Sequence, residues 1–525
     1  MTLWNRFAGK CKRKSYCLWM LSLFVCLCSG TPVAYGQFQE LARYQYREKK
    51  RENKEFRVIP LQKKRAVLLY GTLFSPQKNL SGSTQGYFFE LLDEELRPRW
   101  DTTYALRLSW ELQHVFLEGE EYFHLLFRRN FREYGVLSVQ LDNGELQWLS
   151  TTLPTPLDVD EFLVCGKNAF LLGYYKRHLI GYDFSFFDAS VKAIPKIYEK
   201  WLEPVSYTIA PQEFKAYIAF QYAKTKDCYL LLREFLSNGE MVSELSIPRF
   251  QERTFDHVRL LALPGKGLFM AGSYAFRCDD DAEGLAFGLI RKNVPPRLQY
   301  MPFVDFRHFY DYLPDRRQEK LSEKAERRQQ NQKRKDNPKQ HKMLLQQPIA
   351  GQQHIYLLGE VYRLNYRTSN NNNLNIAMRG RSVLSIYDYL HAHLFVFNHE
   401  GQYVDDYTME LDSEYSRSTQ LKPMVRFVPA GKGFALLHPH KSGIHVKVME
   451  GDSLVFEEKR VPYRKTYAAE EGQKIRPQDA DAFFWYDDYF LLWFPYQEPL
   501  QFSDRPTFYL MKLKVVPPPP QDEAN

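Results

Sequence analysis

Two histidines stand two positions apart in the stretch YLHAHLFVF, at His391 and His393. The stretch has the apolar and aromatic composition of a β-strand, in which residues i and i+2 point to the same face. Paired imidazoles on one face are a common part of zinc sites, which need further ligands to complete the shell. No third ligand can be named from the sequence, so the alternative is a pair of ordinary strand histidines.

A second histidine group lies in HPHKSGIH, which contains His438, His440 and His445. Pro439 separates the first two histidines and Gly443 precedes the third, a composition that is typical of a loop. This loop is a second candidate for metal binding through imidazole nitrogens. The alternative is a polar loop at the rim of a repeated unit.

Acidic side chains cluster in CDDDAEG, at residues 278–284. Carboxylate oxygens are the ligands that Ca²⁺ prefers, but a wrapped calcium loop alternates its acids with other residues. Here the acids stand almost in a run, as Asp279, Asp280, Asp281 and Glu283. We therefore favour a solvated hairpin tip over a calcium site.

Other carboxylates raise the question of glycoside hydrolysis, which needs two acids roughly 5 to 10 Å apart across a cleft. The candidates are Asp405, Asp406, Asp479, Asp481, Asp487 and Asp488. Nothing in the sequence pairs any two of them across a cleft. No Gly-x-Ser-x-Gly, phosphate-binding loop or His-Glu-x-x-His motif occurs either. The sequence therefore predicts no catalytic residue and no cofactor.

The first 36 residues have the three parts of a secretory signal peptide. The positive part contains Arg6, Lys10, Lys12, Arg13 and Lys14. The apolar run SYCLWMLSLFVCLCSG follows, and small residues stand at Ala34 and Gly36. This order predicts export and cleavage before Gln37. An uncleaved membrane anchor is the alternative, although the apolar run is short for a span of roughly 20 residues.

The positive charge of the chain is concentrated in two segments. The net charge is +8, and the predicted signal holds five positive and no negative side chains, which leaves +3. The segment 315–342 carries 11 Lys or Arg against 5 Asp or Glu, a local +6, so the remaining chain is near −3. A basic face for nucleic acid is therefore not predicted.

Cysteines do not form the framework of this fold. Four of the seven lie in the predicted signal, and Cys165, Cys228 and Cys278 remain at wide spacing. One disulfide is possible in an oxidising compartment, but no Cys/His metal spacing occurs.

A pair of hairpins recurs along the chain. The first hairpin joins a strand to a very apolar strand through a tight turn, as in HVFLEGEEYFHLLF (114–127) and RLLALPGKGLFMAGSY (259–274). The second often turns on residues that accept positive φ, as in VLSVQLDNGELQWL (136–149). Eight such units can be counted, at a period of about 50 residues once two inserts are subtracted.

A four-stranded unit of about 50 residues is the size of a β-propeller blade. We predict an all-β fold, a single propeller of seven or eight four-stranded blades over residues 37–516, with a charged helical insert. The last unit shows three strands and ends at TFYLMKLKVV (507–516), so segment 37–55 is expected to supply its outer strand and close the ring. The alternative, a pair of β-sandwiches, does not explain the constant order of the unit.

Two inserts interrupt the repeated units. The charged insert 311–346 is predicted to form an exposed helix followed by a solvated turn, and residues 367–382 form a polar insert. Both are candidate contact sites, because function on such scaffolds sits on loops. The charged insert either touches an anionic surface or is a solvated excursion from one blade. The Pro-rich tail 517–525 is predicted to be disordered.

The segment 300–411 resembles a known group of proteins. It contains FVDFRHFYDYLPD, the charged insert, QQPIAGQQHIYLLGEVYRLNYRT, the polar insert and YDYLHAHLFVFNHEGQYVDDYTMEL. This order is similar to that of large, exported, repeat-built and uncharacterised proteins of Bacteroidota. The resemblance implies a Gram-negative envelope location and a propeller-like fold, and it implies no activity and no catalytic residues.

The sequence therefore favours a binding or scaffold protein over an enzyme. We expect an exported propeller in the periplasm or outer envelope, with a protein or glycan partner and no nucleic-acid partner. Membrane contact is expected only through the signal segment or the charged insert. The alternative is a carbohydrate-active or other hydrolytic enzyme, which would need two carboxylates facing each other in a central cleft.

Overall fold

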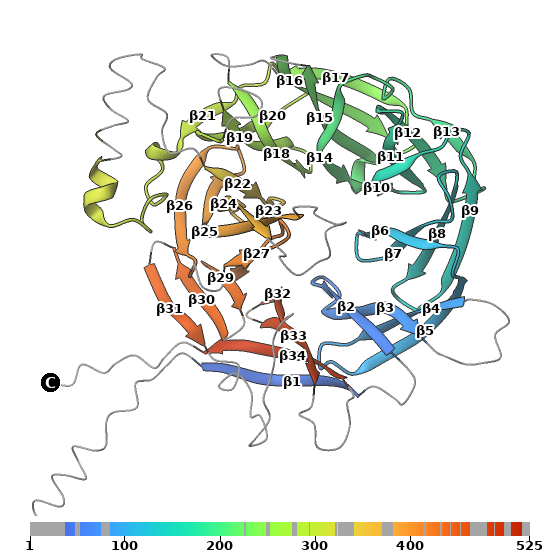
Figure 1. Cartoon of the computed structure of the whole chain (residues 1–525), viewed down its shortest axis with the longest axis horizontal. Helices are drawn as coiled ribbons and strands as arrows, with labels where there is room; N and C mark the ends of the chain where they lie inside the picture. The colour runs from blue at the N-terminus through green and yellow to red at the C-terminus, as the bar shows by residue number, and fades with distance from the viewer. Residues whose placement is uncertain are drawn as a thin grey trace, which may run out of the picture.

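Eight antiparallel sheets stand side by side in a closed ring in the computed structural model (Figure 1). The structure describes residues 37–47, 53–74, 84–224, 227–247, 253–275, 281–292, 294–320, 323, 341–369, 382–412, 416–430, 433–440, 443–451, 453–461, 480–487, 489–497 and 506–516. Each sheet is one blade of a β-propeller, so the predicted fold is confirmed, with eight blades rather than seven.

In the first four blades the strands follow one another outward from the ring centre in chain order (Figure 1). Blade one contains β2 (Asn53–Leu61), β3 (Ala66–Phe74), β4 (Thr84–Leu92) and β5 (Pro98–Arg107). Blade two contains β6 (Glu111–Glu118), β7 (Tyr122–Arg128), β8 (Glu133–Gln140) and β9 (Leu146–Thr152). Blade three contains β10 (Asp158–Cys165), β11 (Asn168–Tyr175), β12 (His178–Ser185) and β13 (Val191–Ala193). Blade four contains β14 (Leu202–Ala210), the 3₁₀ turn η1 (Pro211–Glu213), β15 (Lys215–Lys224), β16 (Asp227–Leu236) and β17 (Met241–Ile247).

The other four blades vary this plan at two places. Blade five contains β18 (Thr254–Leu263), β19 (Gly267–Ala275), β20 (Gly284–Ile290) and β21 (Gln299–Pro302), and η2 (Phe303–Asp305) follows it. Blade six splits its inner strand into β22 (Lys342–Leu345) and β23 (Ile349–Ala350), and adds β24 (His354–Ser369), β25 (Ser382–Asn398), β26 (Tyr403–Glu410) and β27 (Arg417–Ser418). Blade seven contains β28 (Arg426–Ala430), β29 (Gly433–His440), β30 (Gly443–Glu450) and β31 (Ser453–Val461). Blade eight takes β32 (Asp481–Tyr486), β33 (Tyr489–Gln497) and β34 (Pro506–Val516) from the end of the chain.

The outer strand of blade eight is β1 (Gln37–Arg47), from the opposite end of the chain. It pairs antiparallel with β34 over its whole length (Figure 1). Across the joint, the rings of Phe56 and Phe508 stack at a centroid distance of 4.4 Å, and Trp485 Nε1 donates to the carbonyl of Ala66 at 2.9 Å. The prediction that segment 37–55 closes the ring is therefore confirmed.

Each seam between neighbouring blades holds its own cluster of buried apolar side chains, and eight clusters follow the ring around. In β11, Leu171 packs toward blade two while Leu172 packs toward blade four. Residues 169–173 are consequently all buried, whereas the outer strand β9 alternates between partly buried and exposed residues. Covering of both sheet faces explains why the second strand of the repeated unit reads as a continuous apolar run.

The antiparallel order gives the ring two different faces. Turns that join first to second strands, and third to fourth strands, lie on one face, which we call the turn face. Connections between second and third strands, and between blades, lie on the opposite face, which we call the loop face. The turn face is closed by tight turns, for example at Gly144 and Gly239, whose φ angles of 75° and 77° favour glycine. Both predicted inserts depart from the loop face.

Much of the two inserts lies outside the described residues. Within 311–346, residues 315–320 are helical and Lys342–Leu345 form β22. Within 367–382, residues 367–369 end β24 and residue 382 begins β25. The predicted signal segment 1–36 and the tail 517–525 are also outside. In the part of the chain that the structure describes, no helix is long and apolar enough to cross a membrane.

The structure corrects the prediction that HPHKSGIH forms a loop at the rim. His438 and His440 belong to β29, and His445 belongs to β30. The pairing of β28 with β29 ends at Leu437, so the residues beyond it have a strand neighbour on one side only. A proline is tolerated at such a position because it interrupts a single ladder.

Candidate functional site

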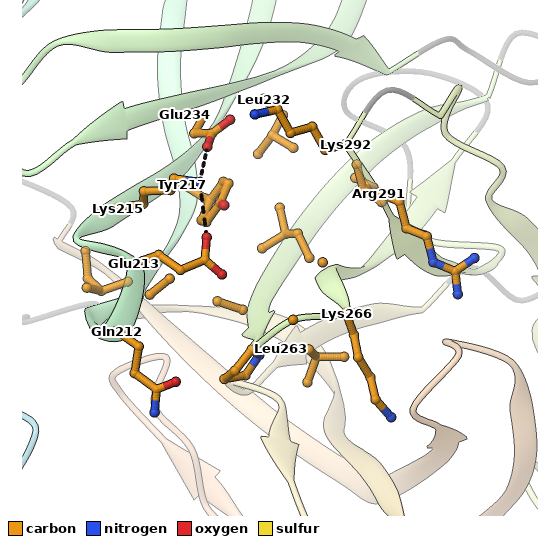
Figure 2. A pocket seen from close by; sticks show the side chains of 18 of the residues that line it. Gln212, Glu213, Lys215, Tyr217, Leu232, Glu234, Leu263, Lys266, Arg291 and Lys292 are labelled. Carbon is orange, nitrogen blue, oxygen red and sulfur yellow. Dashed lines mark hydrogen bonds and ion pairs between the residues drawn. The ribbon is translucent and has the colours of Figure 1, made fainter.

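A groove of about 1140 Å³ opens on the turn face between blades four and five (Figure 2). One wall comes from β15, β16 and β17, and the other from the β18–β19 turn and the segment after β20. Turns of blades one and two also reach the groove, through Lys63 and Gly119. This volume is near the upper end of the roughly 300–1,000 Å³ that ligand pockets usually have.

The wall from blade four carries one lysine between two glutamates (Figure 2). Lys215 Nζ lies 3.1 Å from Glu213 Oε2 and 3.0 Å from Glu234 Oε1. The Ser243 hydroxyl donates to Glu234 Oε2 at 2.8 Å. Burial alone would raise the pKa of Glu234, but the hydrogen bonds from Lys215 and Ser243 hold this pKa below its ordinary value. The wall therefore keeps fixed charges at neutral pH and is not arranged for proton transfer.

The wall from blade five is basic. Lys266 in the β18–β19 turn and Lys292 after β20 are exposed, and neither has an ion pair with another described residue. Arg291 pairs with Glu400 of blade six. In Figure 2, Lys266 and Arg291 lie across the groove from Glu213. The Lys292 charge also helps to lower the pKa of Glu234, so Lys266 is the lysine of this wall with the fewest charged neighbours.

Apolar side chains and prolines form the rest of the lining. They include Ile209, Pro211, Leu245, Pro264, Val294 and Pro295. Phe214, next to the groove residue Glu213, adopts a left-handed backbone with φ of 51° and is 60% exposed. A bulky residue in this conformation is uncommon, and such positions cluster at ligand-contacting sites.

The inner strands of blades two to five share a β-bulge that the sequence does not reveal. The pairing with the second strand shifts at the same place in each blade, after Leu112, Val159, Pro204 and Phe255. A bulge changes the direction of the side chains beside it and is often found next to functional sites. In blade three it places Asp160 and Glu161 together on the inner strand.

Glu161, on the inner strand of blade three, is a candidate acid that no sequence motif marks. Burial and the neighbouring charge of Asp160 raise the pKa of Glu161 to about 6, against the attraction of Arg259. Arg259 Nε donates to the carbonyl of Leu345 at 2.8 Å, which ties the inner strands of blades five and six together. No sequence signal marks this group, since bulges and inter-blade contacts depend on the assembled ring.

β25 places His391 and His393 on one face, as predicted, and both side chains are fully buried. Aromatic rings of the segment after η2 cover them: Tyr312 stacks on His391 at 4.1 Å between centroids, and Phe309 lies 4.8 Å from His393. His393 Nε2 is 3.1 Å from Asp406 Oδ2. Burial lowers the pKa of both imidazoles. Among the described residues, no group of three or more His, Cys, Asp or Glu side chains is placed to hold a metal ion.

The rings of His438 and His440 lie 5.7 Å apart on β29, and His445 pairs with His438 from β30. All three side chains are buried, and His445 Nε2 is 3.2 Å from Glu457. Burial and the two neighbouring imidazoles lower the pKa of His438 to about 3, and burial lowers that of His440 to about 4. These two histidines are therefore neutral at pH 7.

Four of the carboxylates considered for hydrolysis have structural partners. Asp406 accepts backbone N–H groups at 3.0 and 2.8 Å from residues 307 and 308, and Asp405 Oδ1 is 3.5 Å from the Arg307 guanidinium. In blade eight, Asp481 and Asp487 pair with Arg426 and Arg65, at 3.0 and 3.5 Å. Asp479 and Asp488 lie outside the described residues.

The acidic cluster and the cysteines are only partly described. A carboxylate oxygen of Asp281 lies 3.4 Å from Lys342 Nζ, and Glu283 directly precedes β20. Residues 279 and 280 are outside the described chain. Cys165 is buried and free, and burial raises the pKa of its thiol to about 12. The side chain of Cys228 and all of Cys278 are outside, so the possible disulfide stays a prediction.

Comparisons with known proteins assign the chain to no family. No family model and no curated protein matches it. The β-propeller domain of the Trilobed protease from Pyrococcus furiosus is similar at 9% identity and a TM-score of 0.34, over 73% of this chain and 91% of that chain. A prolyl endopeptidase structure is similar at 8% identity and a TM-score of 0.36, over 92% of this chain and 58% of that chain. An uncharacterised protein from Listeria monocytogenes is similar at 10% identity and a TM-score of 0.33, over 81% of this chain and 88% of that chain. Identities of this size identify no shared activity.

Proposed function

We propose that the protein is an exported, non-enzymatic binding protein of the Gram-negative cell envelope that holds an acidic segment of a partner protein. The observation that carries the binding role is the groove between blades four and five. Export is proposed from the signal-like segment 1–36, and the envelope location from the resemblance of segment 300–411.

The chemistry of the groove favours a polypeptide segment as its occupant. Lys266 has no ion pair with another described residue, Lys292 acts electrostatically on Glu234 across the groove, and Glu213 and Glu234 share the charge of Lys215. A chain with acidic side chains and a few basic ones complements both walls. The aliphatic and proline lining offers contact area for its apolar side chains.

Site-specific crosslinking tests the proposal. A photo-reactive residue at Val294, which is 50% exposed in the groove, should capture a partner in the envelope, and one at Val404, 40% exposed on outer strand β26, should not. The double substitution Lys266→Glu with Lys292→Glu should abolish the Val294 crosslink. Arg99→Glu with Arg107→Glu, on outer strand β5, makes the same charge change away from the groove and should preserve it.

Two results would contradict the groove as the binding site. One is equal crosslinking at both positions. The other is a partner that survives the lysine reversal but is lost when the inserts 311–346 and 367–382 are shortened. The second result would move binding to the loop face, as the sequence predicted.

The second candidate is a hydrolytic enzyme, which one observation favours. Asp160 and Glu161 stand together on an inner strand, and the raised pKa of about 6 lets Glu161 act as an acid near neutral pH. Turnover of a glycoside or peptide by the protein, abolished by Glu161→Gln with the Val294 crosslink intact, would support the enzyme. Without such turnover the binding function stands alone.

A further inference from the structure

A second surface, on the loop face, exposes two aromatic side chains that stand three residues apart in one connection, and the ring of His178 stacks on the first of them, Tyr198, at 5.0 Å between centroids. Tyr198 is 64% exposed and Trp201 is 47% exposed, both in the connection between blades three and four. The β11–β12 turn adjoins this connection, because Leu179 and Glu199 form a β-bridge. We call the surface formed by Tyr198, Trp201 and the neighbouring basic residues Lys176, Arg177, Lys196 and Lys200 the aromatic platform.

The platform is held rigidly from beneath. Ile197 and Leu202 are buried in the seam between blades three and four, on either side of the two rings. Buried Arg233 donates to the carbonyl of Lys196 at 2.6 Å and to the carboxylate of Glu199 at 3.0 Å. These contacts fix the backbone that presents the rings, so a ligand would order few additional groups when it binds.

The backbone of the platform is strained at four positions. Positive φ angles occur at Lys176 (48°), Arg177 (67°), Lys196 (60°) and Trp201 (71°). A Trp in this region is a genuine outlier, which persists only where the surrounding contacts enforce it. Trp201 is exposed while the next residue, Leu202, is buried at the start of β14.

The charge of the platform is positive. Lys176, Arg177, Lys196 and Lys200 are exposed, and none has an ion pair with another described residue. The Lys200 ammonium lies 5.0 Å from the Trp201 ring centre. The nearby carboxylate of Glu199 is already taken by Arg233. The rest of the chain outside the charged insert and the signal carries a net negative charge, so the platform is a local basic surface.

We propose that the aromatic platform binds an acidic glycan. Tyr and Trp rings present an apolar face to the C–H face of a sugar ring, and their hydroxyl and N–H groups reach its hydroxyls. The surrounding cations complement carboxylate or phosphate groups on the same chain. The preference for a glycan over a nucleic acid rests on the proposed envelope location, whereas the site itself does not depend on the groove.

Titration calorimetry with defined oligomers tests this site. The probes are a hexamer of galacturonate, a lipid-free phosphorylated lipopolysaccharide core oligosaccharide, neutral cellohexaose, polyglutamate and oligodeoxythymidine. At least one acidic oligosaccharide should bind, and cellohexaose should bind at least tenfold more weakly. The carboxylate and phosphate arms identify which anionic group is preferred, and either result supports the site.

Matched variants separate the platform from general surface effects. Trp201→Ala and Tyr198→Ala should each weaken glycan binding about tenfold, the loss expected for one stacking ring, while Trp201→Phe should recover part of it. Phe131→Ala removes another aromatic on the same face, 55% exposed and also beside a cation, and should change nothing. Lys176→Ala with Arg177→Ala should make binding less sensitive to salt.

Four results would overturn the proposal. They are the failure of both acidic oligosaccharides to bind, polyglutamate binding as well as either of them, tighter binding of oligodeoxythymidine, and unchanged glycan affinity in folded Trp201→Ala. The Lys266→Glu and Lys292→Glu double variant should retain glycan binding. The platform and the groove can therefore fail independently.

Discussion

The seam between blades four and five and the seam between blades six and seven use ionisable side chains in opposite ways. In the first, Lys215 and Glu234 face a groove, and their hydrogen-bonded contact raises the pKa of Lys215 and lowers that of Glu234, so both stay charged at neutral pH. In the second, Glu360 and His438 are shut away from water. Antiparallel blades build both seams, and the difference comes from whether the side chains that face each other meet or leave a gap.

Glu360 shows what burial does in the closed seam. Its carboxylate accepts the backbone N–H of Met424 at 2.8 Å, that of Val425 at 3.2 Å and the side-chain amide of Gln346 at 2.6 Å. Burial raises the pKa of Glu360 to about 7 in spite of these hydrogen bonds. The group therefore anchors the connection that leads into β28, and it has no access to a ligand.

In this protein, the residues whose spacing fits a known type of site are not the residues that a ligand can reach. The spacing of the histidine pairs fits metal sites, but these side chains are buried within the ring. The open groove is lined by lysines, glutamates and prolines that form no motif.

Acidification should separate the two seams most strongly. Folded His438 and His440 titrate at about 3 and 4, below the ordinary histidine pKa near 6.5, so the unfolded chain binds more protons once the pH falls below 6.5. Between pH 6.5 and 4.5 the two histidines should together lower the free energy of unfolding by on the order of 5 kcal/mol. Glu360, whose pKa is raised to about 7, acts in the opposite direction over this range and offsets part of the loss.

Denaturant unfolding across this pH range measures the effect. His438→Gln with His440→Gln should flatten the loss of stability on acidification, and Glu360→Gln should steepen it. His354→Gln, at a half-buried position in blade six, serves as the control. Hydrogen exchange should show β29 and β30 losing protection before β15 and β16. Equal loss in both seams would remove the distinction.

Glu360→Ala should give the next largest effect. It leaves buried N–H groups of residues 424 and 425 without an acceptor, which should cost about 3 kcal/mol. Glu360→Gln keeps an acceptor oxygen and should cost less, measured by urea unfolding at pH 5, where folded Glu360, with its pKa raised to about 7, is protonated and neutral like Gln. If the two variants were equally stable, the carboxylate would not be anchoring this connection.

Glu234→Ala should have a smaller effect because the site borders the open groove. The substitution removes the contacts with Lys215 and Ser243, worth about 1 kcal/mol together at a partly solvated site. The same urea experiment measures it. A loss as large as that of Glu360→Ala would mean that the groove wall is as closed as the other seam.

Lys266→Glu with Lys292→Glu should leave stability almost unchanged, within about 0.5 kcal/mol, because both side chains are exposed and unpaired among the described residues. Thermal unfolding checks this. A drop in melting temperature of several degrees would show that these lysines stabilise the fold and are not simply available to a ligand.

The sequence predicted the architecture because each blade repeats a local signal. A turn flanked by apolar strands is readable within about 15 residues, and eight copies made the ring and its closing strand predictable. HPHKSGIH was wrongly predicted as a loop because Pro439 is exceptional in a strand, and the end of β28 that makes room for it is not visible locally.

The groove could not be predicted, since its walls come from residues far apart in the chain. Lys63 and Lys266 line one cavity only because the ring closes, and no spacing rule connects them. The position of Glu161 depends on a bulge, and the connection that carries Trp201 is held by hydrogen bonds from Arg233 on β16 to Lys196 and Glu199. These features follow from contacts between blades, whereas sequence patterns describe single blades.

The joint between β1 and β34 has a consequence for how the protein is made. The two strands are the first and last of the described chain, so a ribosome that has finished seven blades has not yet produced a ring. Any product that stops before β34 leaves β1 without its partner and blade eight incomplete. An unfinished chain therefore exposes an unpaired strand edge, and proteases that remove unfinished chains would meet this edge on every truncated copy.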